Sequence, residues 1–186
     1  MLRRTLLAAA ALAPFAATAD AAGPAAGDLE NTLYLDLKDG RVVIRLRPDV
    51  APKHVARIKE LTRRKFYDGL KFHRVIEGFM AQTGDPRGDG TGGSDLGNLP
   101  AEFNPMPFTR GILGMARSRD PNSANSQFFI MFADGSFLNG QYTAFGEVVS
   151  GMEFVDKIKK GPKEANGAVP APADTIVRMQ VAADAK

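Results

Sequence analysis

The alternation of apolar and polar residues marks the first structured part of the chain, over residues 31–46. Leucine recurs at every second position in 33–37, and a second run with apolar residues at alternate positions follows in 42–46. The turn-forming pair Asp39-Gly40 lies between the two runs. Alternating runs on either side of such a pair are typical of a β-hairpin. The sequence therefore predicts two paired strands here.

Two other stretches have helical spacing, with apolar residues recurring every third position among basic or acidic ones. The first predicts an amphipathic helix over 52–64, where Pro52 suits the first turn. The second predicts a helix that begins near Met152 and ends near Gly161, where basic residues and a glycine are typical of a helix C-terminus.

The remaining apolar runs are short and predict β-strands. They cover residues 71–76, 79–83, 111–117, 127–132, 143–149 and 175–181. With the hairpin, this makes about eight strands and two short helices, without an internal repeat or the strand–helix alternation of a parallel sheet. The pattern favours a mainly β fold, a closed eight-stranded antiparallel barrel capped by two α-helices.

A loop with six glycines, over residues 84–97, interrupts the strands. Glycine-rich loops can bind phosphate, but this one lacks a Gly-Lys-Ser/Thr sequence and has no amphipathic helix after it. We favour the other interpretation, in which Gly90 to Gly93 let the backbone approach a ligand or a neighbouring strand closely.

The N-terminus predicts a secretory signal peptide over residues 1–19. Arg3 and Arg4 precede a short apolar run, and a small-residue segment follows, with cleavage expected after Ala19 or, as a second candidate, after Ala22. The apolar run is too short to span a bilayer, so we expect export, to the periplasm, without stable membrane insertion after cleavage. The paired arginines leave a twin-arginine export route open.

Composition limits the remaining possibilities. The 186 residues suit one domain, predicted over 31–182 after a flexible Ala/Gly/Pro-rich tether at 20–30. Residues 1–19 carry two of the 24 Lys and Arg and none of the 21 Asp and Glu, so the exported chain would carry 22 basic against 21 acidic groups. This balance gives no electrostatic case for nucleic-acid binding. With no cysteine and two histidines, we expect neither a metal site nor a cofactor.

The candidate chemistry is concentrated between Phe72 and Asp85. Arg74 is a fixed charge in a segment that reads as buried strand, and guanidinium groups are rarely buried without a partner or a function. Two large apolar residues, Phe79 and Met80, and an amide, Gln82, follow within ten residues. This combination predicts a functional site, with a solvent-reaching Arg74 head as the open alternative.

A series of ordered motifs resembles the cyclophilins, which are peptidyl-prolyl cis-trans isomerases, over residues 31–181. The motifs are Phe72-His73-Arg74-Val75-Ile76, Gly78-Phe79-Met80, Gln82-Thr83-Gly84-Asp85, Gly90-Thr91-Gly92-Gly93, Gly111-Ile112-Leu113-Gly114-Met115-Ala116, Ser126-Gln127-Phe128-Phe129-Ile130, Phe137-Leu138-Asn139-Gly140 and Phe145-Gly146. The resemblance implies the same barrel with two capping helices. It also implies acceleration of X-Pro bond rotation in peptides and in folding exported proteins, as in the bacterial exported branch.

The resemblance also implies roles for individual residues. Arg74 would be the catalytic cation that stabilises the twisted amide over an apolar proline pocket, and Gln82 would orient it. The implied substrate-binding residues are His73, Phe79, Met80, Gly90, Ala116, Arg117, Gln127, Phe129, Phe137, Leu138 and Tyr142. For His73 we favour a structural role in the strand over proton transfer, because the reaction moves no proton.

Three of these positions depart from the eukaryotic cytosolic pattern. Phe137, Tyr142 and Arg117 stand where those members have tryptophan, histidine and asparagine. Without the indole N–H, we expect weak binding of cyclosporin. Two rival functions are a peptide-binding module without catalysis and a hydrolase using Ser123 or Ser126, but neither serine has an evident His-Asp partner. We expect a monomer that binds proline-containing peptides and unfolded chains.

Overall fold

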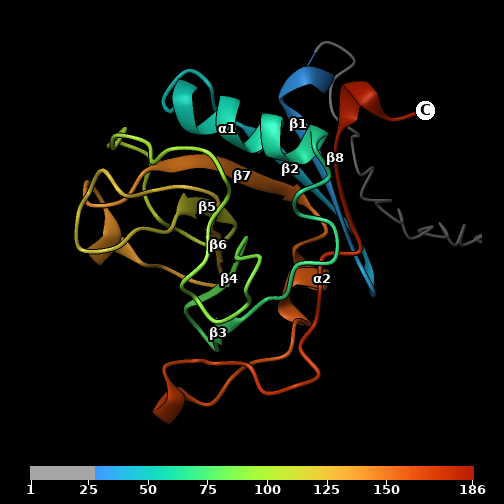
Figure 1. Ribbon diagram of the computed structural model, residues 1–186, viewed down its shortest axis with the longest axis vertical. Helices are drawn as coiled ribbons and strands as arrows, with labels where there is room; N and C mark the ends of the chain where they lie inside the picture. The colour runs from blue at the N-terminus through green and yellow to red at the C-terminus, as the bar shows by residue number, and fades with distance from the viewer. Residues whose placement is uncertain (1–27) are drawn as a thin grey trace, which may run out of the picture.

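The predicted hairpin is present in the computed structural model, which describes residues 28–186 (Figure 1). Strand β1 (Thr32–Leu37) pairs antiparallel with β2 (Gly40–Leu46), and Leu37 lies opposite Gly40 across a two-residue turn. A Cβ atom at Gly40 would overlap the ring of Phe154, so the close packing there requires glycine. The predicted signal peptide, and the predicted tether up to residue 27, lie outside the described residues.

Eight strands form one antiparallel sheet in the order β3-β4-β6-β5-β7-β2-β1-β8. The strands after the hairpin are β3 (Arg74–Ile76), β4 (Met80–Thr83), β5 (Ile112–Met115), β6 (Phe128–Met131), β7 (Ala144–Ser150) and β8 (Arg178–Val181). The prediction of eight antiparallel strands is confirmed. Most of the strands are shorter than predicted.

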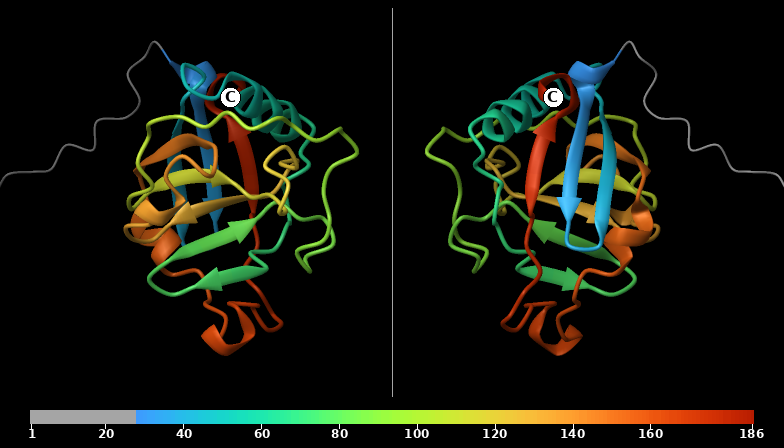
Figure 2. Two further views of the ribbon diagram at one scale, coloured as in Figure 1. Left: turned by 90° about the vertical axis from the view of Figure 1, so that its left-hand side faces the viewer. Right: turned by 90° about the vertical axis from the view of Figure 1, so that its right-hand side faces the viewer.

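The prediction of a closed barrel is wrong, because the sheet is an open half-barrel (Figure 2). Strands β3 and β8, at its two ends, form no ladder with each other in residues 28–186. The outer edge of β3 is already occupied, since the Val75 amide donates to the Gly167 carbonyl at 2.8 Å. Before β8, Ile176 exchanges backbone hydrogen bonds with Gly69 and Leu70. Irregular segments therefore satisfy the backbone groups that a closing ladder would have used.

Both predicted helices are present. Helix α1 (Pro52–Arg63) has its proline in the first turn and packs its apolar side on the sheet. Helix α2 (Met152–Asp156) ends earlier than predicted, because the next amides bond three residues back, Lys157 to Phe154 and Ile158 to Val155. No helix in the described part of the chain is long and apolar enough to cross a membrane.

The sheet has hydrophobic residues on both faces. The larger cluster fills the concave side under α1 and includes Val75, Ala81, Phe128 and Ile130. A second cluster lies on the opposite face and is formed by Met80, Met106, Phe108, Ile112, Phe129, Met131, Leu138 and Ala144. Successive residues of a strand point to opposite faces, so neighbours such as Phe128 and Phe129 belong to different clusters. The second cluster supports the candidate site.

Candidate active site

Strand register places the candidate residues in one row across the outer face of the sheet. Arg74 on β3 lies opposite Gln82 on β4, Gln82 lies opposite Phe129 on β6, and Phe129 lies opposite Gly114 on β5. Because directly opposed residues share a face, their side chains lie together. A cation, an amide and an aromatic ring thus come into contact from three strands.

Three polar partners orient the guanidinium group of Arg74. Its Nη1 atom donates to Gln82 Oε1 at 3.2 Å, its Nε to the Asn166 carbonyl oxygen at 3.1 Å, and its Nη2 to Asn166 Oδ1 at 3.0 Å. Burial lowers the pKa of Arg74 from its ordinary value, though an arginine remains charged under all physiological conditions. Arg74 is therefore a partly desolvated cation whose head is held by hydrogen bonds although it still reaches solvent.

A pocket of about 240 Å³, called the apolar pocket because most of its lining side chains are apolar or aromatic, lies beside this cation. It is lined by Arg74, Phe79, Met80, Gln82, Ala116, Arg117, Phe129, Phe137, Leu138 and Tyr142. Phe129, which is 5% exposed, is stacked on Phe108 with ring centroids 5.7 Å apart and meets Tyr142 edge to face at 6.0 Å. Packed aromatic rings give the pocket a rigid floor, which suits a flat apolar group.

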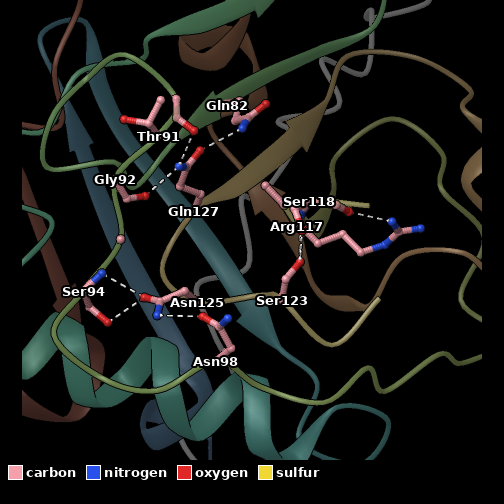
Figure 3. Close-up of a pocket in the computed structure, with 13 residues that line it drawn as sticks. Gln82, Thr91, Gly92, Ser94, Asn98, Arg117, Ser118, Ser123, Asn125 and Gln127 are labelled. Atoms are coloured by element: carbon pink, nitrogen blue, oxygen red, sulfur yellow. Dashed lines mark hydrogen bonds between the residues drawn. The ribbon is translucent and has the colours of Figure 1, made fainter. Parts of the chain in front are cut away.

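A polar pocket of about 410 Å³ adjoins the apolar one and shares Gln82, Ala116 and Arg117 with it (Figure 3). Gln82 Nε2 donates to Gln127 Oε1 at 2.9 Å, and Gln127 Nε2 donates to the carbonyl oxygens of Gly90 and Gly92. This relay connects the guanidinium of Arg74 to the glycine-rich loop.

The wall of the polar pocket is held by Asn125. Its Oδ1 atom accepts hydrogen bonds from the backbone N–H and the hydroxyl of Ser94, at 2.8 and 2.7 Å, and its Nδ2 donates to the Leu96 carbonyl at 2.7 Å. Arg57, on α1, donates to the carbonyl oxygens of Asn125 and Gly97. Figure 3 shows Asn125 between Ser94 and Asn98 at the base of this loop. The loop is thus fixed by side chains and not by a ladder.

Most of the residues expected at the site lie together, and two need separate comment. His73 is buried and lines neither pocket; a Cβ at Gly90 would lie 3.8 Å from its ring. Arg117 donates to the carbonyls of Gln141 and Ser118, and its guanidinium lies 4.3 Å from the Tyr142 ring centre. Figure 3 shows the side chain of Arg117 directed away from Gln127. Arg117 therefore stabilises the wall of the pocket through its contacts with Gln141, Ser118 and Tyr142.

The aromatic rim of the apolar pocket is accessible from solvent. Phe137 is 63% exposed, and its ring centroid lies 5.5 Å from that of Phe79. Leu138, the next residue, is buried in the second cluster. Of these two adjacent apolar residues, Phe137 thus forms an exposed rim and Leu138 a buried wall.

Two residues of the site were not singled out in the sequence, Asn125 and Asn166. Asn125 belongs to a stretch that reads as polar loop, and Asn166 precedes a glycine, which is a turn signal without chemical content. Asn166 lies 92 residues from Arg74 along the chain. No local pattern connects residues so distant.

The described residues also bear on metal chemistry. Within 28–186, no group of three His, Cys, Asp or Glu side chains is placed to hold a metal ion. The polar groups that surround the pockets are amides, hydroxyls, backbone carbonyls and arginines. These groups can form hydrogen bonds, and the arginines supply a fixed positive charge.

Comparison with known proteins agrees with this architecture. The family model for cyclophilin type peptidyl-prolyl cis-trans isomerases matches residues 32–181. A probable peptidyl-prolyl cis-trans isomerase of Brucella suis is 58% identical over 98% of both chains. The peptidyl-prolyl cis-trans isomerase B of Bacillus subtilis is 42% identical over 70% of this chain and 92% of its own length.

Solved structures give the same result. A cyclophilin from Hirschia baltica superposes with a TM-score of 0.76 at 27% identity, covering 86% of this chain and 76% of its own. A cyclophilin-type isomerase from Cryptosporidium parvum, solved in the presence of the dipeptide Ala-Pro, has a TM-score of 0.73 at 29% identity and covers 81% and 98%. Sequence and fold thus define one class of enzyme. The chain belongs to the cyclophilin-type peptidyl-prolyl cis-trans isomerase family, and its activity is that of the class.

Proposed function

We propose that the apolar pocket binds the proline ring of a peptide and that Arg74 stabilises the twisted amide during rotation. The observation that carries the proposal is the guanidinium of Arg74, partly buried and held by Gln82 and Asn166 at the edge of an aromatic floor. The Ala-Pro dipeptide present with the Cryptosporidium relative supports a proline-containing ligand of this size.

The reaction requires no bond to be made or broken. Rotation about a peptide bond costs about 18–20 kcal/mol, because twisting destroys the resonance that keeps the amide planar. The planar amide has more charge separation than the twisted one. A poorly hydrated pocket floored by Phe129 therefore disfavours the ground state relative to the transition state.

Twisting also makes the proline nitrogen a pyramidal hydrogen-bond acceptor. A donor from Arg74 can bind it in the transition state but not in the planar ground state, and such differential binding accelerates a step. A hydrogen bond from a charged group contributes about 1.5–3 kcal/mol, and each factor of ten in rate takes about 1.4 kcal/mol. The hydrogen bond from Arg74 would therefore raise the rate of rotation about ten- to a hundredfold.

The test is cis-trans exchange of an Ala-Pro peptide measured by NMR line shape. Arg74→Ala should lower kcat about ten- to a hundredfold and change KM little. Arg110→Ala is the matched control, since Arg110 is exposed and paired with Asp156 away from both pockets. Equal losses in kcat and in peptide affinity would show that Arg74 anchors the substrate, and unchanged kcat would refute the proposal.

We further propose that the enzyme is exported to the periplasm, where its substrates would be folding exported polypeptides and it would act as a monomer. The supporting observation is the N-terminal pattern of Arg3 and Arg4, a short apolar run and a small-residue segment ending at Ala19. N-terminal sequencing of the protein from fractionated cells should give a chain that begins after Ala19 or Ala22. An uncleaved chain in the cytoplasm would contradict export.

A further inference from the structure

We infer that Asn166 is a positioning residue for catalysis, which holds the guanidinium of Arg74 in its productive orientation. The inference rests on the catalytic role proposed for Arg74. Asn166 lines neither pocket, so it would act through Arg74 and not through direct contact with the substrate.

The geometry of the contact is that of a clamp. The backbone oxygen of Asn166 accepts from Arg74 Nε at 3.1 Å, and its Oδ1 accepts from Nη2 at 3.0 Å. Gln82 accepts from Nη1 at 3.2 Å, on another side of the group. Nη1 also makes a weak contact with Met80 Sδ at 3.9 Å, so of the five N–H donors of the guanidinium one, on Nη2, remains for the substrate. Acceptors on Nε, Nη1 and Nη2 fix both the plane of the group and its rotation within that plane.

The clamp is built into the segment that covers the open edge of the sheet. In this segment the Gly161 amide donates to the Val75 carbonyl at 2.9 Å, and the Gly167 carbonyl accepts from Val75 at 2.8 Å. Both bonds connect it to the residue that follows Arg74. In both views of Figure 2 this orange segment lies beyond β3, at the lower edge of the sheet. The edge pairing that keeps the sheet open therefore also brings Asn166 to Arg74.

The backbone at Asn166 makes asparagine a specific choice. Asn166 is in the left-handed conformation, with φ of 51°, and Gly167 follows with φ of 75°. Among residues with a side chain, asparagine and aspartate tolerate this conformation best, and both carry an acceptor at Oδ1. A Cβ at Gly167 would overlap Ile76, so the close approach of this turn to β3 requires glycine after Asn166. Asparagine at position 166 thus provides both the left-handed backbone conformation and the Oδ1 acceptor for Arg74.

The test compares substitutions that separate the acceptor from the backbone. Asn166→Gly keeps the left-handed turn and the backbone acceptor but removes Oδ1, and it should lower kcat about tenfold with little change in KM. Asn166→Asp keeps an acceptor and should retain most of the activity. Lys65→Gly is the matched control, because Lys65 is the other residue with a side chain in the left-handed conformation, φ 57°, in the described part of the chain. It should leave kcat unchanged.

A second readout reports on Arg74 directly. In the free enzyme, the Nη2–H signals of Arg74, which lose the Oδ1 acceptor, should move and exchange faster with water in Asn166→Gly but not in Lys65→Gly. In an Arg74→Ala background, Asn166→Gly should cause no further loss of kcat, because nothing is left to position.

The outcomes separate the two proposals. If Arg74→Ala lowers kcat but Asn166→Gly does not, or if Asn166→Gly lowers it equally in the Arg74→Ala background, the positioning role is wrong and the role of Arg74 stands. If Arg74→Ala itself leaves kcat unchanged, the mechanism fails and the clamp fails with it.

Discussion

Replacement of Asn125 by alanine would test how the polar pocket is built. The Asn125 amide makes three short hydrogen bonds to the loop at Ser94 and Leu96, and a longer one, 3.3 Å, to Asn98. Asn125→Ala removes all four and leaves the backbone N–H and hydroxyl of Ser94 without their acceptor. We therefore expect a loss of stability and a loosened pocket wall.

The size of the loss follows from the bonds. A neutral hydrogen bond contributes about 1 kcal/mol net, so three short ones give about 3 kcal/mol. Because Asn125 is half-buried, water can replace some of these partners, and we expect a fall of about 2 kcal/mol in the free energy of unfolding. Asn98→Ala loses only the 3.3 Å bond and should cost less than about 0.5 kcal/mol.

Urea unfolding of the two variants and the parent chain measures these differences. In parallel, peptide exchange should show weaker binding for Asn125→Ala, with kcat close to that of the parent because the apolar pocket is untouched. The reasoning would be refuted by equal stabilities for Asn125→Ala and Asn98→Ala. A fall in kcat without any change in affinity would also contradict it, since it would tie the loop to the chemical step.

Three further predictions concern pH, packing and inhibitor binding. Burial lowers the pKa of His54 and His73 below the ordinary value of 6.5. Both histidines are therefore neutral in the folded and unfolded protein well above pH 6.5, and folding is not opposed by their protonation there. As the pH falls below 6.5 the unfolded chain binds protons more readily, so the free energy of unfolding decreases. The melting temperature should therefore fall between pH 7.5 and 5.5, and a flat profile would contradict this. Gly114→Ala would place a Cβ against the ring of Phe129, so it should cost about 1–3 kcal/mol in urea unfolding and weaken peptide binding; a neutral effect would show that the ring moves freely. In a calorimetric titration, cyclosporin should bind the parent chain weakly and the Phe137→Trp variant more tightly. Tight binding by the parent chain would overturn the expectation.

The elements could be predicted from sequence where a local pattern carries the whole signal. The hairpin needs only alternating leucines and a two-residue turn, and α1 needs only a repeated apolar position and Pro52. The openness of the sheet could not be predicted, because it depends on which segment reaches the outer edge of β3. That segment is an Ala/Gly/Pro-rich stretch whose composition indicates a linker.

The contacts of the site could likewise be predicted only where the residues are close in sequence. Arg74 and Gln82 lie opposite each other because they are eight residues apart on adjacent strands of a tight hairpin, so local sequence contains their contact. Asn166 reaches the same group from 92 residues away, which no local pattern encodes. The inward position of His73 could have been inferred, since neighbours in an extended chain point to opposite faces and Arg74 faces outward.

The pairing of β1 with β8 has a consequence for the order of events during synthesis. Leu33 lies opposite Val181, so the second edge of β1 receives its partner only when almost the whole chain exists. At roughly 5–20 residues per second, a ribosome needs about 7–30 s to make the intervening residues. During that time the outer edge of β1 in the finished hairpin is unpaired, and other chains can also recognise it. This cyclophilin-type isomerase thus has a strand whose edge is paired only near the end of its own translation.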